Sequence, residues 1–298
     1  MGGGGDVVGA LGLTDLCEAL DTDWELGGVA WERTPIDPHP GPRPVAQIRG
    51  GRRLEADAVL ADGETTTPEG AHFAESRMAA HLGRETALID ISGGPGGAAR
   101  AIESAAAALR CDLAIVLDVG GDVLGRGDEP GLASPLCDAV MLAATAELAP
   151  GLPAIAAVYG PGCDGELTPA EVLERIGDLG AAGALLGAWG LTPAACERVE
   201  AAARVVPTEA SLQAVRCARG ERGTIEIRGG RRTVELTSAG GLTFLFDPRR
   251  AVAAAAPLAA AVRAATGIEG ARDALAALGV GTELDLERAR AAGGPAPD

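Results

Sequence analysis

The sequence predicts an α/β fold, because short, continuous apolar segments alternate with helical segments through its middle. Three apolar segments, at 87–91, 113–119 and 154–159, are each followed by a glycine-rich turn and then by a helix. Strands that are apolar on both sides are typical of a parallel sheet covered on both faces. Right-handed crossovers would bring the carboxyl ends of these strands to one edge. We therefore expect a Rossmann-like, doubly wound, mostly parallel sheet with its glycine-rich loops at that edge.

The helices between these strands have recognisable boundaries. Residues 7–20 and 74–82 are expected to be helical, and residues 24–31 are expected to form a strand between them. A helix should follow the turn at 92–97 and end near Leu109, and another should span 134–148. Thr168, Pro169 and Glu171 combine an N-cap, a proline at the first helical position and a capping-box glutamate. A helix should therefore begin at this point.

After residue 205 the pattern changes. Residues 224–228 and 232–236 alternate apolar and charged side chains around a Gly-Gly pair, which predicts a β-hairpin. A strand at 242–246 is expected to join this hairpin, followed by helices at 248–265 and 270–278. We therefore expect two parts: a Rossmann-like α/β core at 1–205 that carries the ligand-binding loops, and a β-hairpin and helical extension at 206–298 packed on it.

The N-terminus carries a turn, Gly2 to Gly5 with Asp6, that runs directly into a helix. A turn of this kind normally follows a buried strand, as in nucleotide-binding βα units. Two readings are open. Either a first strand precedes the printed chain, which is the interpretation we favour, or Gly2 to Gly5 form a flexible tail.

Composition narrows the class of function. The formal net charge of −17 opposes binding to nucleic acid or to an anionic membrane surface. All 25 basic residues are arginine, so lysine chemistry, including a P-loop or a Schiff base, is excluded. The six cysteines form no CxxC pair, which favours reduced thiols in a cytoplasmic protein. No stretch approaches 18 uninterrupted apolar residues, so we expect no transmembrane helix.

Carboxylates are densest in the loop after the strand at 113–119 and in the helix that follows it. They include Asp118, Asp122, Asp128, Glu129 and Asp138. Carboxylates gathered at one sheet edge repel one another unless a cation, a basic ligand group or a proton lies between them. Mg²⁺, which prefers oxygen ligands, is a candidate cofactor. We expect Asp118, Asp122, Asp128 and Glu129 to organise a cation or transfer protons, with the first three as metal ligands; the alternative is that they cap helices.

The expected ligand-binding residues lie in the turns at the same edge. Backbone N–H groups in glycine-rich turns can bind an anion, and an arginine can clamp a phosphate or carboxylate. Cys163 lies in such a turn, although no histidine is near it in the sequence and a structural thiol is the stronger reading. The full set is Gly3, Gly4, Gly5, Asp6, Arg33, Gly93, Gly94, Gly120, Gly121, Arg126, Cys163, Asp164 and Glu166.

Several blocks of sequence resemble a known family. They are GGGGDVVGA (2–10), GGVAWER (27–33), PGPRP (40–44), DVGGDVL (118–124), GDEPGLASPLCDA (127–139) and GPGCDGEL (160–167). These blocks are similar to domain-of-unknown-function family 1152, whose members come from archaea and actinobacteria. The resemblance covers nearly the whole chain. It supports the fold and the choice of site, and it implies no reaction.

From these observations we expect a small-molecule enzyme. Its substrate would be a phosphorylated, nucleotide-like or carboxylated metabolite, with Mg²⁺ as a candidate helper. The alternatives are a non-catalytic ligand-binding or sensor protein and a subunit of a larger complex. The partner should be a small-molecule ligand rather than nucleic acid or membrane, and a homo-oligomer is left open.

Overall fold

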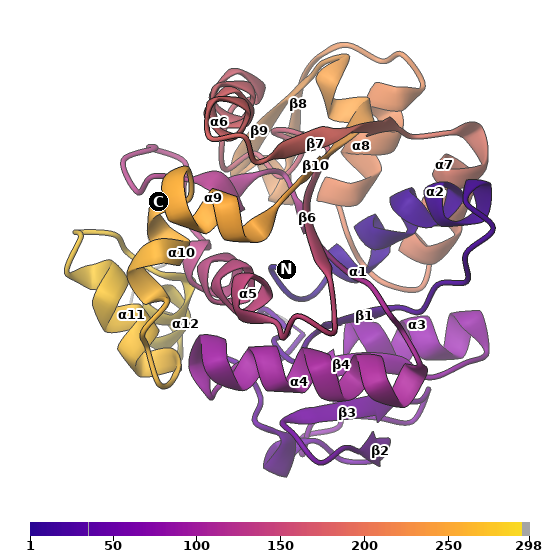
Figure 1. Ribbon diagram of the computed structural model, residues 1–298, viewed down its shortest axis with the longest axis vertical. Helices are drawn as coiled ribbons and strands as arrows, with labels where there is room; N and C mark the ends of the chain where they lie inside the picture. The colour runs from indigo at the N-terminus through magenta and orange to yellow at the C-terminus, as the bar shows by residue number, and fades with distance from the viewer. Residues whose placement is uncertain (35, 294–298) are drawn as a thin grey trace.

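The computed structural model, which describes residues 1–34 and 36–293, is a mixed α/β protein (Figure 1). Its main strands form two four-stranded sheets, ordered β1-β4-β3-β2 and β5-β6-β10-β7. The first sheet contains β1 (Gly27–Val29), β2 (Arg52–Arg53), β3 (Ala58–Ala61) and β4 (Thr86–Ile89). The second contains β5 (Ala114–Val119), β6 (Ala154–Tyr159), β7 (Leu185–Gly190) and β10 (Leu242–Phe246). A separate hairpin consists of β8 (Gly223–Ile227) and β9 (Arg232–Leu236).

In each sheet, three of the four strands run in the same direction. β1 is parallel to β4, and β5 is parallel to β6. β3 is antiparallel to both of its neighbours, and so is β10. The expectation of an α/β fold is therefore confirmed, with mixed sheets that each contain one reversed strand.

Helices connect the strands and cover the sheets. The α-helices are α1 (Asp6–Gly9), α2 (Thr14–Ala19), α3 (Ala74–Leu82), α4 (Gly94–Leu109), α5 (Pro135–Glu147), α6 (Pro169–Ala181), α7 (Pro193–Ala203), α8 (Ala210–Ala218), α9 (Pro248–Ala254), α10 (Pro257–Val262), α11 (Ile268–Ala276) and α12 (Glu283–Ala291). Short 3-10 turns are η1 (Ala10–Leu13), η2 (Val45–Gln47), η3 (Asp122–Leu124), η4 (Arg228–Gly230) and η5 (Ala239–Gly241). The largest core cluster joins α4 and α5 to strands of both sheets, and a second joins α1, α3 and α7. Among the described helices, none is both long and apolar enough to cross a membrane.

Several predicted elements match the structure closely. Strands β5 and β6 and helix α3 lie where the sequence placed them, and the capping box of α6 is present at Thr168 and Glu171. The N-terminal helix is broken into α1, η1 and α2. Gly9 and Gly12 let this segment approach Val119 and Tyr159 so closely that a Cβ atom at either position would collide with those side chains.

Two predictions about the C-terminal part were wrong. The strand expected to extend the hairpin, β10, instead lies in the second sheet between β6 and β7. Its sequence, LTFLF, is apolar enough for a central position, where both faces of a strand are covered. The helix expected at 248–265 is divided at Pro257, which begins α10. Residues after 205 therefore contribute to the core sheet itself.

The facing edges of the two sheets enclose a cavity. β1 ends the first sheet and β5 ends the second, and about 180 Å³ of empty space lies between them. Apolar side chains from α1 and α4, including Val7, Ile102 and Ala105, form walls of this interstrand cavity. The N-terminus lies in the middle of the molecule between the two sheets (Figure 1).

We predict that Thr168→Ala lowers the free energy of unfolding by about 1 kcal/mol, because it removes the side-chain cap of α6. Urea denaturation measures this. Thr168→Ser keeps the hydroxyl and should remain within about 0.5 kcal/mol of the parent protein. Equal stability of the Ala and Ser variants would contradict this role for the cap.

Candidate functional site

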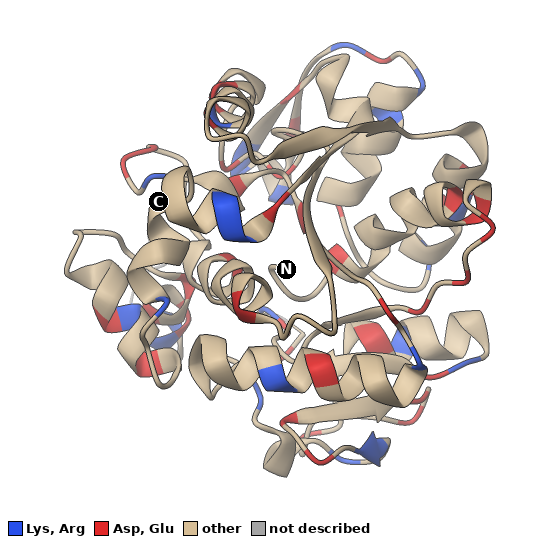
Figure 2. Cartoon of the chain, in the orientation of Figure 1, with Lys and Arg blue, Asp and Glu red and all other residues tan. Residues whose placement is uncertain are grey.

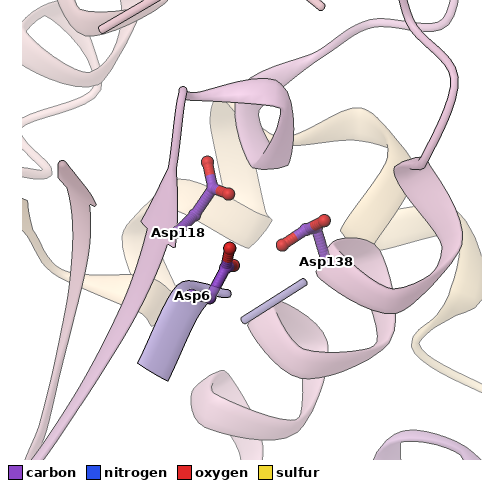
Figure 3. A group of neighbouring side chains, drawn as sticks. All are labelled: Asp6, Asp118 and Asp138. Carbon is purple, nitrogen blue, oxygen red and sulfur yellow. The ribbon is translucent and has the colours of Figure 1, made fainter. Parts of the chain in front are cut away.

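Three aspartates from distant parts of the sequence meet above the carboxyl end of β5. Asp6 begins α1, Asp118 lies near the end of β5, and Asp138 lies in the first turn of α5. One oxygen from each lies within 4.8 Å of the others. Their carboxylates point into a shared space (Figure 3). We call these residues the first carboxylate cluster.

The first carboxylate cluster is largely closed to solvent. Asp118 is 1% exposed and Asp138 is 2% exposed, whereas the Asp6 side chain is 22% exposed. The Oδ1 atom of Asp138 is buried without a hydrogen-bond partner among the described residues. Burial, reinforced by Asp118, raises the pKa of Asp138 well above its usual value. Burial and the nearby Asp6 likewise raise the pKa of Asp118 to about 7.

The positive group acting on all three aspartates is the amino group of Met1. It lies 3.3 Å from Asp6 Oδ2, and it donates a hydrogen bond to the carbonyl oxygen of Leu117. Burial alone would lower the pKa of this amine, but Asp6, Asp138 and Asp118 outweigh burial and raise it to about 10. The amine is therefore held as a cation inside the fold.

A second group of carboxylates lies beside the first. Asp122 belongs to η3, and Asp164 and Glu166 lie in the loop after β6; one oxygen from each lies within 4.8 Å of the others. We call these residues the second carboxylate cluster. Asp118 links the two clusters, because its side chain forms a hydrogen bond with Asp122. Burial, together with repulsion from Asp118, raises the pKa of Asp122 well above its usual value.

In the second carboxylate cluster, an arginine side chain and backbone N–H groups partly compensate the negative charge. Arg232 lies 2.8 Å from Glu166 Oε1 and 4.0 Å from Asp164 Oδ2. The backbone N–H groups of Ala133 and Ser134 also donate to Glu166. Burial would raise the pKa of Glu166, but Arg232 and these donors lower it. Asp164 is different, because its buried Oδ1 has no partner in the described part of the chain and burial raises its pKa strongly.

Two glycines hold the loop after β5 against this group. Gly120 has a φ of +119° and Gly121 a φ of +110°, a region that L side chains rarely adopt. A Cβ atom at Gly120 would also collide with the Asp164 carboxylate. The Gly-Gly pair therefore sets the approach of Asp122 to Asp164, and it lies at the site where the sequence placed it.

Of the four residues expected to handle a cation or protons, two lie in the clusters. Asp118 and Asp122 are brought together, but Asp128 is exposed and lies outside both clusters. Glu129 accepts hydrogen bonds from the backbone N–H groups of Arg126 and Gly127, so it stabilises its own loop. Residues that are close in sequence are therefore separated in the structure.

The two expected arginine clamps are already paired. Arg33 donates to the carbonyl oxygen of Gly2 and pairs with Glu283 and Glu287 of α12. Arg126 pairs with Asp178 at 2.7 Å on the surface, away from both clusters. Arg33 therefore holds the N-terminal turn, and Arg126 holds α6 to the loop after η3.

The remaining expected ligand-binding residues lie in well-packed turns. Gly3 and Gly4 have positive φ values, and the N–H of Gly2 donates to Asp6 Oδ2 at 2.7 Å, so Gly2 to Gly5 form a defined turn and not a flexible tail. A Cβ at Gly5 would collide with Thr208, and one at Gly94 would collide with the backbone of Ala265 and Gly267. Gly93 precedes α4 beside that contact. Cys163 is fully buried, with its sulfur against Gly240.

Two buried carboxylates were not among the predicted site residues. Asp138 was noted only as part of the densest acidic region, although it is the lone charge in the apolar stretch PLCDAVMLAATA of α5. Glu75 had no such signal. Its side chain is buried beside β1, neither carboxylate oxygen has a partner among the described residues, and burial together with Glu32 raises its pKa.

Acidity alone does not mark the site, because acidic residues are spread over most of the chain (Figure 2). What distinguishes the two clusters is burial and convergence of chain segments that belong to the blocks at 2–10, 118–139 and 160–167. The sequence matches the family described as protein of unknown function DUF1152 over residues 1–291. The chain belongs to the DUF1152 family. Comparison with curated proteins and with solved structures found no match.

The charge balance of the first cluster leads to a pH-dependent prediction. The pKa of Asp138 is raised in the folded state. Its contribution to the free energy of unfolding is therefore fully present below about pH 4, and it is lost as pH rises through the folded pKa. In the presence of EDTA and near pH 8, Asp138→Asn should have a free energy of unfolding more than about 1 kcal/mol higher than that of the parent protein. Near pH 4 the two proteins should differ little.

Urea denaturation at both pH values measures this difference. Asp128→Asn is the matched control, because Asp128 is exposed. If Asp138→Asn were less stable than the parent near pH 8, the unpartnered carboxylate would not be a source of destabilisation.

Proposed function

We propose that this protein is an enzyme that uses a divalent cation, such as Mg²⁺, to act on a small phosphorylated or carboxylated metabolite. The observation that carries the proposal is the buried Oδ1 of Asp138, which has no protein partner among the described residues and points into a group of three carboxylates. A buried polar atom in a native protein almost always has a partner. A cation bound by Asp6, Asp118 and Asp138 would supply one.

The chemistry of the first cluster favours a hard cation. Its possible ligands are carboxylate oxygens, the type that Mg²⁺ and Ca²⁺ prefer. In the second cluster, Arg232 and backbone donors already compensate Glu166, although Asp164 Oδ1 is also buried without a partner among the described residues. Among the described residues, the first cluster is compensated by the Met1 amine, which lies 3.3 Å from Asp6 Oδ2, and by the charge of Arg33, which acts on Asp138.

The exposure of the first cluster supports binding of a substrate on one side. Mg²⁺ usually keeps several waters and bridges one or two protein carboxylates to a substrate phosphate. Asp6 is the most exposed member, so the open coordination positions would face the N-terminal turn. A metabolite with an anionic group would bind there through the cation, which would offset the repulsion from this acidic protein.

The second cluster would provide proton transfer next to the cation. Burial and neighbouring carboxylates keep the pKa values of Asp122 and Asp164 well above their usual range. A carboxyl group with a raised pKa can hold the proton that general acid catalysis transfers. Asp122 contacts Asp118, so a proton on Asp122 would lie next to one of the proposed metal ligands.

A Rossmann-like organisation fits this proposal. In open α/β sheets, ligands bind outside the carboxyl ends of the strands, where the strand order reverses. The proposed site lies at the carboxyl ends of β5 and β6, in loops rich in glycine.

The first test is cation binding. Near pH 8, millimolar Mn²⁺ or Mg²⁺ should raise the melting temperature of the protein by about 4–8 °C if the free cation is about 100 times its dissociation constant. Asp6→Asn and Asp138→Asn should reduce the shift to within about 1 °C, because each removes a charged ligand. Asp128→Asn should keep the full shift. Equal shifts in all three variants would exclude the first cluster as the cation site.

The second test separates an enzyme from a binding protein. Phosphorylated and carboxylated metabolites are screened with Mn²⁺ present, first for a further thermal shift and then for turnover. Asp122→Asn should abolish turnover while keeping the Mn²⁺ shift, because it removes the proposed proton carrier. A metabolite that stabilises the protein but is never converted, at any pH from about 6 to 9, would favour the non-catalytic alternative.

A further inference from the structure

Two buried cysteines from distant parts of the sequence lie side by side. Cys163 belongs to the turn after β6, and Cys217 lies in the last turn of α8. Their Sγ atoms lie 3.2 and 2.6 Å, respectively, from the point where a Cβ atom at Gly240 would be. The two side chains also form a hydrogen bond with each other. Both sulfurs therefore fill the space beside a residue that has no side chain.

The surroundings of the two thiols differ. A hydrogen bond from Cys163 lowers the pKa of Cys217, and it outweighs the opposite effect of burial. A backbone hydrogen bond from Thr237 and the positive charges of Arg222 and Arg216 act in the same direction, so the pKa is about 7. The guanidinium of Arg222 also donates to the carbonyl oxygen of Cys217 at 3.1 Å, which holds its charge nearby. In Cys163, the same hydrogen bond and burial raise the pKa well above its usual value.

This asymmetry separates the pair from the rest of the cysteines. A thiolate reacts with oxidants, whereas a buried thiol is inert, and a neighbouring cysteine can convert the first oxidation product into a disulfide. Cys217 supplies the thiolate, and Cys163 supplies the neighbouring thiol. In the other cysteines of the chain, burial raises the pKa and favours the unreactive thiol; they are Cys17, Cys111, Cys137 and Cys196.

Cys217 is the member of the pair nearer to the surface. It is 2% exposed, whereas Cys163 is 0% exposed, and residues 218–220, which directly follow it, are exposed. The end of a helix opens locally at a smaller free-energy cost than unfolding of the whole protein. Opening of the last turn of α8 would therefore expose the Cys217 sulfur first, and only to a small oxidant.

We propose that Cys217 and Cys163 form a modification site, which a hydroperoxide such as hydrogen peroxide oxidises to a disulfide. The Cys217 sulfur attacks one peroxide oxygen, so an S–O bond forms, the O–O bond breaks and the other oxygen leaves as water. The Cys163 sulfur then attacks the Cys217 sulfur. The S–S bond forms, the S–O bond breaks, and the hydroxyl group leaves as a second water with the Cys163 proton. The two sulfurs are oxidised, and the peroxide is reduced to two waters.

The disulfide joins α8 to the loop that carries part of the second carboxylate cluster. Cys163 directly precedes Asp164 in this loop, and the N–H of Gly162 donates to the carbonyl oxygen of Gly120 at 2.7 Å. Oxidation therefore adds a covalent restraint beside Asp164. Neither a cation nor a substrate takes part in the step, so the disulfide forms whether or not the protein is an enzyme.

Mass spectrometry of the full-length protein tests the disulfide. Protein freed of reductant is treated with a slight excess of hydrogen peroxide in EDTA, then unfolded and labelled with N-ethylmaleimide. The reduced chain carries six thiols. We expect the oxidised chain to take two fewer labels, with Cys163 and Cys217 recovered in one linked pair of tryptic peptides, and dithiothreitol to restore full labelling. Full labelling after peroxide, or a link between any other two cysteines, would overturn the proposal.

Substitutions test the role of each sulfur. Cys163→Ser should leave Cys217 as a sulfenic acid that dimedone traps. Cys217→Ser should slow the oxidation of Cys163 about ten-fold or more, because it removes the thiolate. Cys196→Ser, which removes a buried thiol outside the pair, should form the disulfide at the parent rate.

Oxidation of Cys163 at the parent rate in Cys217→Ser would contradict the assignment of Cys217 as the nucleophile. The disulfide itself is measured in the parent protein, so a variant that fails to fold leaves the first experiment decisive. Because EDTA is present throughout, failure of the cation proposal leaves this result intact.

Discussion

Carboxylates buried above the carboxyl ends of β5 and β6 need positive partners, and the arrangement of the surrounding structure follows from that requirement. Arg232 and backbone N–H groups supply partners for Glu166. The Met1 amine and Arg33 act on Asp138 through their charge, but the Oδ1 atom of Asp138 has no hydrogen-bond partner among the described residues. Charged groups without partners inside a protein shift their pKa values or bind a counter-ion. For this reason we propose a cation between Asp6, Asp118 and Asp138, where no arginine forms a salt bridge with the described carboxylates.

The first carboxylate cluster also lies next to the gap between the two sheets, where β1 and β5 are not paired with each other. The first carboxylate cluster lies at the end of the interstrand cavity, and the Met1 amine belongs to both. The Met1 nitrogen therefore contacts both the carboxylate cluster, through Asp6, and strand β5, through the carbonyl oxygen of Leu117.

Much of this organisation could be predicted from the sequence, because the signals were local. Apolar runs gave β5 and β6, and Thr168 with Glu171 gave the start of α6. Asp118 and Asp122 were predicted because they directly follow a buried strand. Asp128 and Glu129 were wrongly grouped with them, because the Glu129 carboxylate accepts hydrogen bonds from the N–H groups of Arg126 and Gly127 in its own loop and Asp128 is exposed. The place of β10 also depends on long-range pairing that its five residues do not encode.

Anomalous diffraction from crystals grown with Mn²⁺ near pH 8 would reveal a divalent cation bound by the first carboxylate cluster. We expect a peak within about 2.0–2.2 Å of oxygens from Asp6, Asp118 and Asp138, and no peak at that position in crystals of Asp138→Asn. A peak only between Asp122, Asp164 and Glu166, or no peak at either cluster, would rule out cation binding by the first cluster.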